Sequence, residues 1–460
     1  NLGNLLLDQG RAGEAATHYA AASNVRRRVG SETRWNADLF EKTTKAKLRH
    51  DIEQIAFMRQ NGVAFDGIDG LEALYAETLD ALPADLGATE PAPLPAVTRD
   101  RMAAVYNRIH YVHPAERMAA PIVNPEIDWA RIERDYAANG PGWVVIDDFL
   151  TEPALEALWR YCQLSTFWFN FYYRNGYLGT SIEAGFTAPL LIQIGEALRT
   201  SMPALLAPHP LRKVWSFKKC DYSTPAAVGL HADFAAVNSN FWITPDSANL
   251  EPAGAGLEIW DKEAPLEWDF AAFNAGKEKS RDFLRESGAK RIDVPYRRNR
   301  MIVFNSNLFH ESGPVTFKPG YENHRINVTM LFGQRGARPL QYQALGSSGC
   351  QARALDAYGG EDQRHFRAGA RAADDIERAA VQLGQAGAGE VAAPVVFELH
   401  ERRQRPRDVR RGHADAGIGD RHRQFAGGRA CGRHCHPAPG IGELHGVRQQ
   451  VQKHLGQAQP

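Results

Sequence analysis

Short, strand-like runs between residues 142 and 333 limit the fold of this chain more than any other feature. Most of the runs are rich in β-branched and aromatic residues and are bounded by Gly, Pro, Asn or Asp. They cover 142–150, 166–173, 211–222, 234–244, 256–260, 290–296, 299–305 and 323–333. The first run leads into a helix that is expected to begin near Thr151. Many short strands with helices gathered before them predict an α+β fold, in which helices flank a β-sandwich or jelly roll.

The chain before these runs is predicted to be mainly helical. Helices are expected over 34–60, 70–82 and 98–109, and the Pro/Ala-rich stretch 81–98 is expected to be a linker. The first 30 residues match the spacing of a tetratricopeptide repeat at Leu2, Gly3, Leu6, Gly10, Ala15, Tyr19 and Ala22. One incomplete repeat cannot bury its own face, so this segment resembles the last unit of an array. An ordinary amphipathic helix pair is the alternative.

The C-terminal segment differs in composition from the rest of the chain. All nine tryptophans lie between Trp35 and Trp268, and residues 341–460 contain 16 Arg, 1 Lys and 13 Asp+Glu. The segment 339–460 has too little hydrophobic periodicity to bury a core. Three interpretations remain open: a disordered low-complexity extension, an out-of-frame translation of GC-rich coding sequence, or a metal-binding module. The candidate ligands of such a module are Cys431, His434, Cys435 and His436.

Composition and charge argue against several classes of protein. The chain has 54 Lys+Arg and 54 Asp+Glu, which gives no reason to expect a nucleic-acid or anionic-membrane partner. No apolar run approaches the ~20 residues of a membrane helix. Five scattered cysteines do not make a disulfide scaffold, so a reducing, cytoplasmic location is expected. Motifs for phosphoryl transfer, zinc proteolysis and serine hydrolysis are absent from the sequence.

Three residues with the chemistry of a metal site fall within the β-rich region. His231 and Asp233 stand at the start of the run GLHADFAAVNSNFWIT, and His310 follows the apolar run RMIVFNSNLF. Residues i and i+2 of a strand project from the same face, so the imidazole of His231 and the carboxylate of Asp233 can converge. Two histidines and one carboxylate on one face of a metal form the facial triad of non-haem Fe(II) oxygenases. Each histidine taken alone is more often structural.

Arg325 is a fourth candidate, 15 residues after His310 in the run NHRINVTMLFG. Arg325, Asn327 and Thr329 alternate with apolar residues, so one face of the expected strand is polar and lines either solvent or a pocket. An arginine in a pocket offers a planar fork that pairs bidentately with a carboxylate.

With these residues in place, 140–334 resembles the Fe(II)- and 2-oxoglutarate-dependent dioxygenases of the prolyl-hydroxylase-like branch. The family motif is a His-x-Asp, a distant second His and an Arg, which are here His231, Asp233, His310 and Arg325. Phrases such as VPYRRNRMIVFNSNLFHES look like a bacterial subgroup that carries tetratricopeptide repeats. The resemblance implies a double-stranded β-helix (jelly-roll) oxygenase domain. The whole chain then divides into four segments, which are a repeat-like segment 1–30, a helical segment with a linker 31–119, the oxygenase domain 120–338 and the tail 339–460.

The resemblance also implies a reaction. His231, Asp233 and His310 would hold Fe(II), with 2-oxoglutarate and O₂ as cosubstrates. An unidentified substrate would be hydroxylated, with release of succinate and CO₂. Hydroxylation is favoured because related halogenases have a small residue where this chain has Asp233.

The resemblance assigns cosubstrate roles to residues near Arg325. Arg325 would pair with the C5 carboxylate of 2-oxoglutarate, and Tyr222 and Thr329 are candidate hydroxyl partners of that carboxylate. Tyr222 has a core aromatic role as its alternative. Many relatives have Ser or Thr where this chain has Asn327. The chain therefore departs from the family pattern at a position where relatives contact the cosubstrate.

Alternatives to the leading hypothesis remain on the sequence alone. The leading hypothesis is an oxygenase whose repeat segment recruits a protein or peptide substrate, or oligomerises the enzyme. A catalytically silent repeat adaptor with an oxygenase-like fold competes with it, as does a metal-dependent jelly-roll enzyme that ignores 2-oxoglutarate. Side chains that could line the substrate pocket, with turn, edge or core roles as alternatives, are Asn238, Asn240, Trp242, Trp260 and Trp268.

Overall fold

The computed structural model describes most of the chain up to residue 335. The described residues are 2–29, 38–172, 176–220, 229–268, 272–273 and 277–335, and all of them fall in one compact unit. Tyr222 and the tail 339–460, with its four candidate metal ligands, lie outside the described residues. Within the described part, no helix is both long enough and apolar enough to span a membrane.

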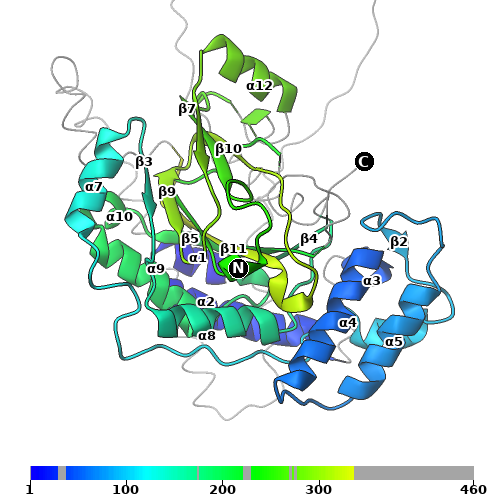
Figure 1. Cartoon of the computed structure of the whole chain (residues 1–460). Coiled ribbons are helices and arrows are strands. Elements are labelled where there is room, and N and C mark those ends of the chain that lie inside the picture. The colour runs from blue at the N-terminus through cyan, green and yellow to red at the C-terminus, as the bar shows by residue number, and fades with distance from the viewer. Residues whose placement is uncertain are drawn as a thin grey trace, which may run out of the picture. The chain divides into compact units, whose positions relative to one another are not determined.

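The structure is of the α+β class, with helices before and among the strands (Figure 1). The helices are α1 Leu2–Asp8, α2 Ala12–Arg27, α3 Asp38–Glu41, α4 Lys45–Gln60, α5 Ile68–Asp80, α6 Arg99–Val105, α7 Trp129–Ala138, α8 Glu152–Leu164, α9 Pro189–Ser201, α10 Pro203–Leu206 and α12 Lys277–Glu286. Short 3-10 turns are η1 Ile182–Ala184, η2 Asp246–Ala248 and η3 Tyr321–Asn323. The strands are β1 Lys42–Thr43, β2 Ala92–Pro93, β3 Trp143–Ile146, β4 Tyr177–Ser181, β5 Leu211–Lys219, β6 Val237–Trp242, β7 Leu257–Glu263, β8 Arg291–Val294, β9 Met301–Asn305, β10 Leu308–Ser312 and β11 Arg325–Phe332.

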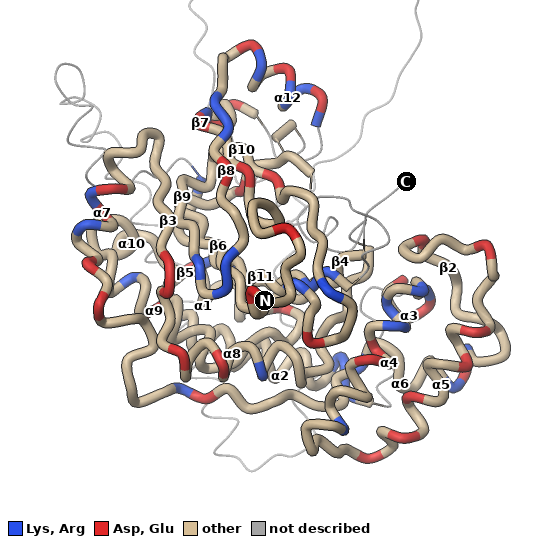
Figure 2. Tube along the Cα trace, in the orientation of Figure 1, with Lys and Arg blue, Asp and Glu red and all other residues tan. Residues whose placement is uncertain are grey.

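Two antiparallel sheets dominate the β region. A six-stranded sheet has the order β3-β9-β6-β11-β5-β4, and a three-stranded sheet has the order β10-β7-β8. Strands β6 and β9, in the middle of the larger sheet, contain no charged residue, whereas charges of both signs alternate along α12 (Figure 2). This contrast is expected of central strands that are buried on both faces.

Each face of the six-stranded sheet contributes to a different hydrophobic core. One face, with Val303, Phe241 and Val328, packs with residues of α8 and α9. The other face, with Trp242 and Phe304, packs with Leu257, Ile259 and Val294 of the smaller sheet. Side chains alternate between the two faces of a strand, so one set of strands supplies both cores. The polar residues Asn238 and Asn240 of β6 belong to this second face, as do Arg325, Asn327 and Thr329 of β11.

The helical segment before residue 120 packs directly on the β region. Gln54 of α4 is buried, and its Nε2 donates to the main-chain oxygens of Gln163 and Ser165 at 3.2 and 2.9 Å. The ring of His50, also on α4, stacks on His324 with 5.9 Å between centroids. His324 directly precedes β11, so α4 supports the beginning of that strand.

The Pro/Ala-rich stretch 81–98 is held against the neighbouring helices. Ala92–Pro93 (β2) pairs with Lys42–Thr43 (β1), and the side chains of Leu82 and Leu94 are buried. These contacts hold the stretch in place over most of its length.

The first two helices form the close pair that their small residues predict. A Cβ on Gly3 would lie 2.8 Å from Cζ of Tyr19, so only glycine allows α1 to approach α2 so closely. Whether the pair descends from a tetratricopeptide repeat stays a prediction.

Several sequence-based element predictions need correction. The expected helix 34–60 is broken, because β1 separates α3 from α4 and Thr44 caps α4 by accepting a hydrogen bond from the Lys47 amide. The run 166–173 is not a strand within the described residues, apart from a bridge between Asn170 and Gly179. Its aromatic side chains are buried in an irregular segment, so their abundance reflected burial and not strand pairing.

Replacement of Gln54 by Ala should destabilise the protein, because the buried oxygen of Ser165 would lose its side-chain donor. We expect the free energy of unfolding to fall by about 1–3 kcal/mol. Gln60→Ala, at the exposed end of the same helix, is the matched control and should change it by no more than about 0.5 kcal/mol. Urea denaturation monitored by circular dichroism measures both, and equal effects would contradict the role of Gln54 in holding α4 against the end of α8.

Candidate metal centre

Main-chain pairing between two segments far apart in sequence brings the three candidate ligands together. The His231 amide donates to the His310 oxygen at 3.0 Å, and the His310 amide donates to the His231 oxygen at 2.8 Å. The Asp233 amide donates to the Ser306 oxygen at 2.9 Å, which fixes the next turn of the chain. The site therefore forms where the segment before β6 pairs with β10.

This arrangement differs in two ways from the sequence-based expectation. His310 lies inside strand β10 and does not follow a strand, because the chain turns at Ser306 and Asn307 and pairs again. His231 and Asp233 precede β6, which begins at Val237, so their convergence comes from pairing with β10 and not from alternation along β6.

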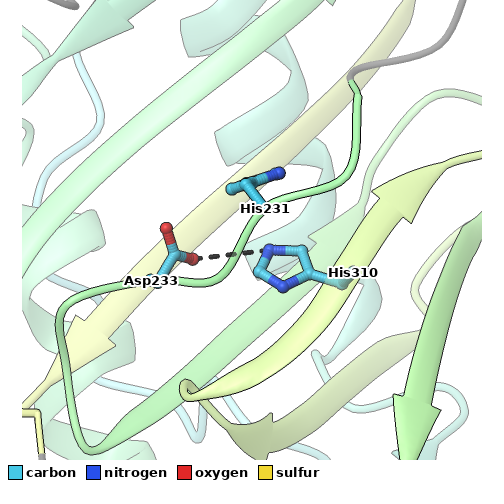
Figure 3. A group of neighbouring side chains, drawn as sticks. All are labelled: His231, Asp233 and His310. Atoms are coloured by element: carbon cyan, nitrogen blue, oxygen red, sulfur yellow. Dashed lines mark ion pairs between the residues drawn. The ribbon is translucent and has the colours of Figure 1, made fainter. Parts of the chain in front are cut away.

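The side chains of His231, Asp233 and His310 converge on one point (Figure 3). One potential ligand atom from each lies within 4.8 Å of the other two. His310 Nε2 is 3.5 Å from Asp233 Oδ2, and the two imidazole centroids are 4.2 Å apart. Asp233 and His310 are buried, while His231 is partly exposed, so the side of the site nearest solvent is the His231 side.

Main-chain oxygens fix the orientation of both imidazoles. His231 Nδ1 lies 2.8 Å from the Gly229 oxygen, and His310 Nδ1 lies 3.0 Å from the Leu308 oxygen. A carbonyl oxygen can only accept, so each Nδ1 carries a proton and each Nε2 is the ring nitrogen left to face a metal. Such an outer partner is the usual arrangement for a metal-ligating histidine. The donor set, two imidazoles and one carboxylate, fits an Fe(II)-type divalent ion.

Burial shifts the protonation equilibria of two of these ligands. Burial, and then the charge of His231, lower the pKa of His310 well below its usual value. Burial raises the pKa of Asp233, against the opposing effects of His231 and of a hydrogen bond from Asn238. His310 is therefore a neutral imidazole at neutral pH, as metal binding requires.

Arg325 lies on the face between the two sheets and is buried. Its Nε donates to the Ala255 oxygen at 2.8 Å, and its guanidinium lies beside the neighbouring rings of Trp242 and Tyr296, 5.8 and 5.9 Å from their centroids. Of the two settings that the sequence left open for Arg325, a pocket or solvent, its burial excludes solvent. Sequence reasoning missed Tyr296, although its position at the end of the strand-like run 290–296 was a signal of burial.

Thr329 and Asn327 share the face of β11 that carries Arg325. Asn240 Nδ2 donates to Thr329 Oγ1 at 3.1 Å, and Asn327 Nδ2 lies 3.5 Å from the same oxygen. Arg325 Nη1 lies 3.4 Å from Asn327 Oδ1. Because Thr329 Oγ1 accepts, its own hydroxyl proton remains available to a ligand.

Three consecutive inward-facing residues of β6 carry polar atoms with no hydrogen-bond partner among the described residues. They are Asn238 Oδ1, Asn240 Oδ1 and Trp242 Nε1, and all three side chains are buried. Asn238 contacts Asp233, and Trp242 contacts Arg325, so the row runs from the triad to the arginine. Buried polar atoms are rarely left unpaired, so the row fits a polar ligand between the sheets.

The other two candidate tryptophans lie in a separate hydrophobic cluster beside the triad. Trp260 and Trp268 are partly buried against a cluster that includes Leu230, Ala232 and Phe309, which neighbour the metal-site histidines. Trp268 meets Phe309 edge to face, with 6.2 Å between centroids. These residues form an apolar wall next to the site.

The bend that receives Arg325 depends on Gly256. A Cβ on Gly256 would lie 1.8 Å from the Val294 oxygen, whereas a Cβ on Gly254 would meet nothing closer than 3.6 Å. We expect Gly256→Ala to lower the free energy of unfolding by about 1–3 kcal/mol or more, because main chain must move. Gly254→Ala should change it by about 0.5 kcal/mol at most. Thermal melting of both variants checks this, and similar melting temperatures would contradict the close approach.

Comparisons with known proteins found distant structural likenesses. No family model and no curated protein sequence matches the chain. The non-heme alpha ketoglutarate dependent epimerase SnoN from nogalamycin biosynthesis is 14% identical with a TM-score of 0.34, over 46% of this chain and 92% of that chain. A Pseudomonas putida prolyl-4-hydroxylase is 18% identical with a TM-score of 0.30, over 45% and 100%. HygX from Streptomyces hygroscopicus with iron bound is 12% identical with a TM-score of 0.29, over 45% and 88%. The function of this chain is therefore argued from its own site.

Proposed function

We propose that this protein is an Fe(II)- and 2-oxoglutarate-dependent dioxygenase that hydroxylates an unidentified substrate, with release of succinate and CO₂. The observation that carries the proposal is the triad itself. His231, Asp233 and His310 have ligand atoms within 4.8 Å of one another, in a site where both imidazoles present Nε2. Three protein ligands on one side leave the opposite positions of a metal for a chelating cosubstrate and O₂.

The placement of Arg325 supports 2-oxoglutarate as that cosubstrate. Its guanidinium is buried between the sheets at one end of the polar row on β6, and the triad lies at the other end. In the proposed complex, Arg325 and the hydroxyl of Thr329 hold the C5 carboxylate, with Asn327 beside them. Tyr222 is retained as a proposed partner of that carboxylate. Two antiparallel sheets with a shared interior are the arrangement expected of a double-stranded β-helix.

The chain's own residues have three tasks in this reaction. Bound iron and 2-oxoglutarate supply the oxidation, and the protein supplies geometry and a dry surrounding. The main-chain oxygens of Gly229 and Leu308 keep the imidazoles in the ligating tautomer. The buried positions of Asp233 and His310 exclude water on one side, so a substrate approaches from the His231 side. The wall around Trp268 and Phe309 would then contact it.

The helix pair α1–α2 is proposed to recruit a protein or peptide substrate, as a repeat unit would. Leu2, Leu5 and Val25 are exposed on this pair, which suits contact with a further apolar surface.

Anaerobic addition of Fe(II) and 2-oxoglutarate to the full chain tests the proposed function without a known substrate. We expect the weak visible charge-transfer band of a metal-bound 2-oxo acid, and its loss in His310→Ala. Arg325→Ala should raise the 2-oxoglutarate concentration needed for half of the band by about 10- to 100-fold, because a charged hydrogen-bonded pair is lost. Arg285→Ala, an exposed arginine on α12, is the control and should leave the titration unchanged.

Each outcome of this titration separates two hypotheses. An iron-loaded, folded protein without the band would overturn the dioxygenase proposal in favour of a silent adaptor. A band that needs no more 2-oxoglutarate in Arg325→Ala would instead overturn the assignment of Arg325.

A further inference from the structure

The carboxylate of Asp233 has a side-chain partner on the central sheet. Asn238 Nδ2 donates to Asp233 Oδ2 at 2.6 Å, and both side chains are buried. Among the described residues, no other side chain donates a hydrogen bond to this carboxylate, whose remaining close contact is His310 Nε2 at 3.5 Å. Asn238 thus donates to Oδ2, the same carboxylate oxygen that faces His310.

The two ends of this hydrogen bond differ in how firmly the main chain holds them. Asn238 belongs to β6, which is hydrogen-bonded to β9 on one side and to β11 on the other. Asp233 lies in the irregular segment before β6, where its amide bond to Ser306 fixes the main chain but not the carboxylate. Rotation of the Asp233 carboxylate is therefore restrained by Asn238 on β6, and not by the segment that contains Asp233 itself.

The histidines are restrained differently. Their Nδ1 atoms meet main-chain oxygens, at Gly229 and Leu308, which no substitution of a side chain removes. Within the part of the chain that the structure describes, Asp233 alone among the three ligands receives a hydrogen bond from a side chain that orients it. Loss of an outer partner of a metal ligand typically weakens metal binding by 10- to 100-fold.

We propose that Asn238 is a positioning residue, whose amide N–H holds the Asp233 carboxylate toward the two imidazoles before a metal ion binds. This inference rests on the part of the proposed function that assigns a divalent metal to the triad. With Asn238 in place, the carboxylate loses little rotational freedom when the metal arrives. Without it, the carboxylate must be ordered by the metal itself.

Asn240 provides a matched control on the same strand. It faces the same interior two residues further on, it is buried, and its Oδ1 also lacks a partner among the described residues. Its Nδ2 donates to Thr329 Oγ1 and not to a triad residue. Leu is similar in size to Asn. Replacement of either asparagine by Leu therefore removes an amide from the same face of β6 with little change in side-chain size.

The test is the affinity of the full chain for Co(II) alone, measured by visible absorption without 2-oxoglutarate. We expect Asn238→Leu and Asn238→Ala to weaken Co(II) binding by about 10- to 100-fold. Asn240→Leu and Asn240→Ala should weaken it by less than about threefold, since they leave the outer partners of all three ligands intact. Thermal melting of the metal-free proteins measures the loss of stability separately, so a purely structural role for Asn238 would show there and not in affinity.

Failure of this inference can be told apart from failure of the proposed function. If wild-type protein binds Co(II), His310→Ala abolishes binding, and Asn238→Leu binds as tightly as Asn240→Leu, only the positioning role is overturned. If wild-type protein binds no Co(II) at the triad, the metal site and the proposed function are overturned together.

Discussion

The reciprocal main-chain hydrogen bonds between His231 and His310 are the interaction on which the site depends. They join the segment that enters the six-stranded sheet to a strand of the three-stranded sheet, so the ligands are assembled by the packing of two sheets. The apolar core between the sheets, with Trp242 and Ile259, keeps that packing in register. A change that loosens the sandwich would therefore separate the ligands without touching any of them.

Burial of the triad has opposite electrostatic consequences in the metal-free protein and in the protein with a bound cation. Removal of Asp233 and His310 from water disfavours their charged forms, which is why burial raises the pKa of Asp233 and lowers that of His310. A metal ion reverses this effect for the carboxylate, because it compensates the negative charge directly. The free protein therefore carries an electrostatic cost at the triad that a bound cation would relieve.

Sequence reasoning named the three residues that the structure brings together, but it did not predict the main-chain setting that does so. Strand β11 was predictable because Arg325, Asn327 and Thr329 alternate with apolar residues, and alternation reports directly which face each side chain takes. The strand that contains His310 was not predicted, because it follows β9 after a turn of only two residues and the apolar run continues through that turn. The outer partner of each histidine is the main-chain oxygen two residues before it, such as that of Leu308 for His310, and every residue has such an oxygen, so no sequence pattern marks it. The bond from Asn238 to Asp233 depends on how the irregular segment before β6 folds against that strand, so it was not predicted either.

The packing of α4 against the start of β11 makes this helix part of the folded unit that holds the candidate site. His50 and Gln54 lie on a helix that precedes the oxygenase-like region in sequence, yet they contact His324 and the end of α8 from within the shared core. A fragment that begins at residue 120 would lose this helix and expose the surface behind Arg325. A graft of the candidate site onto another protein would therefore have to carry α4 together with the β region.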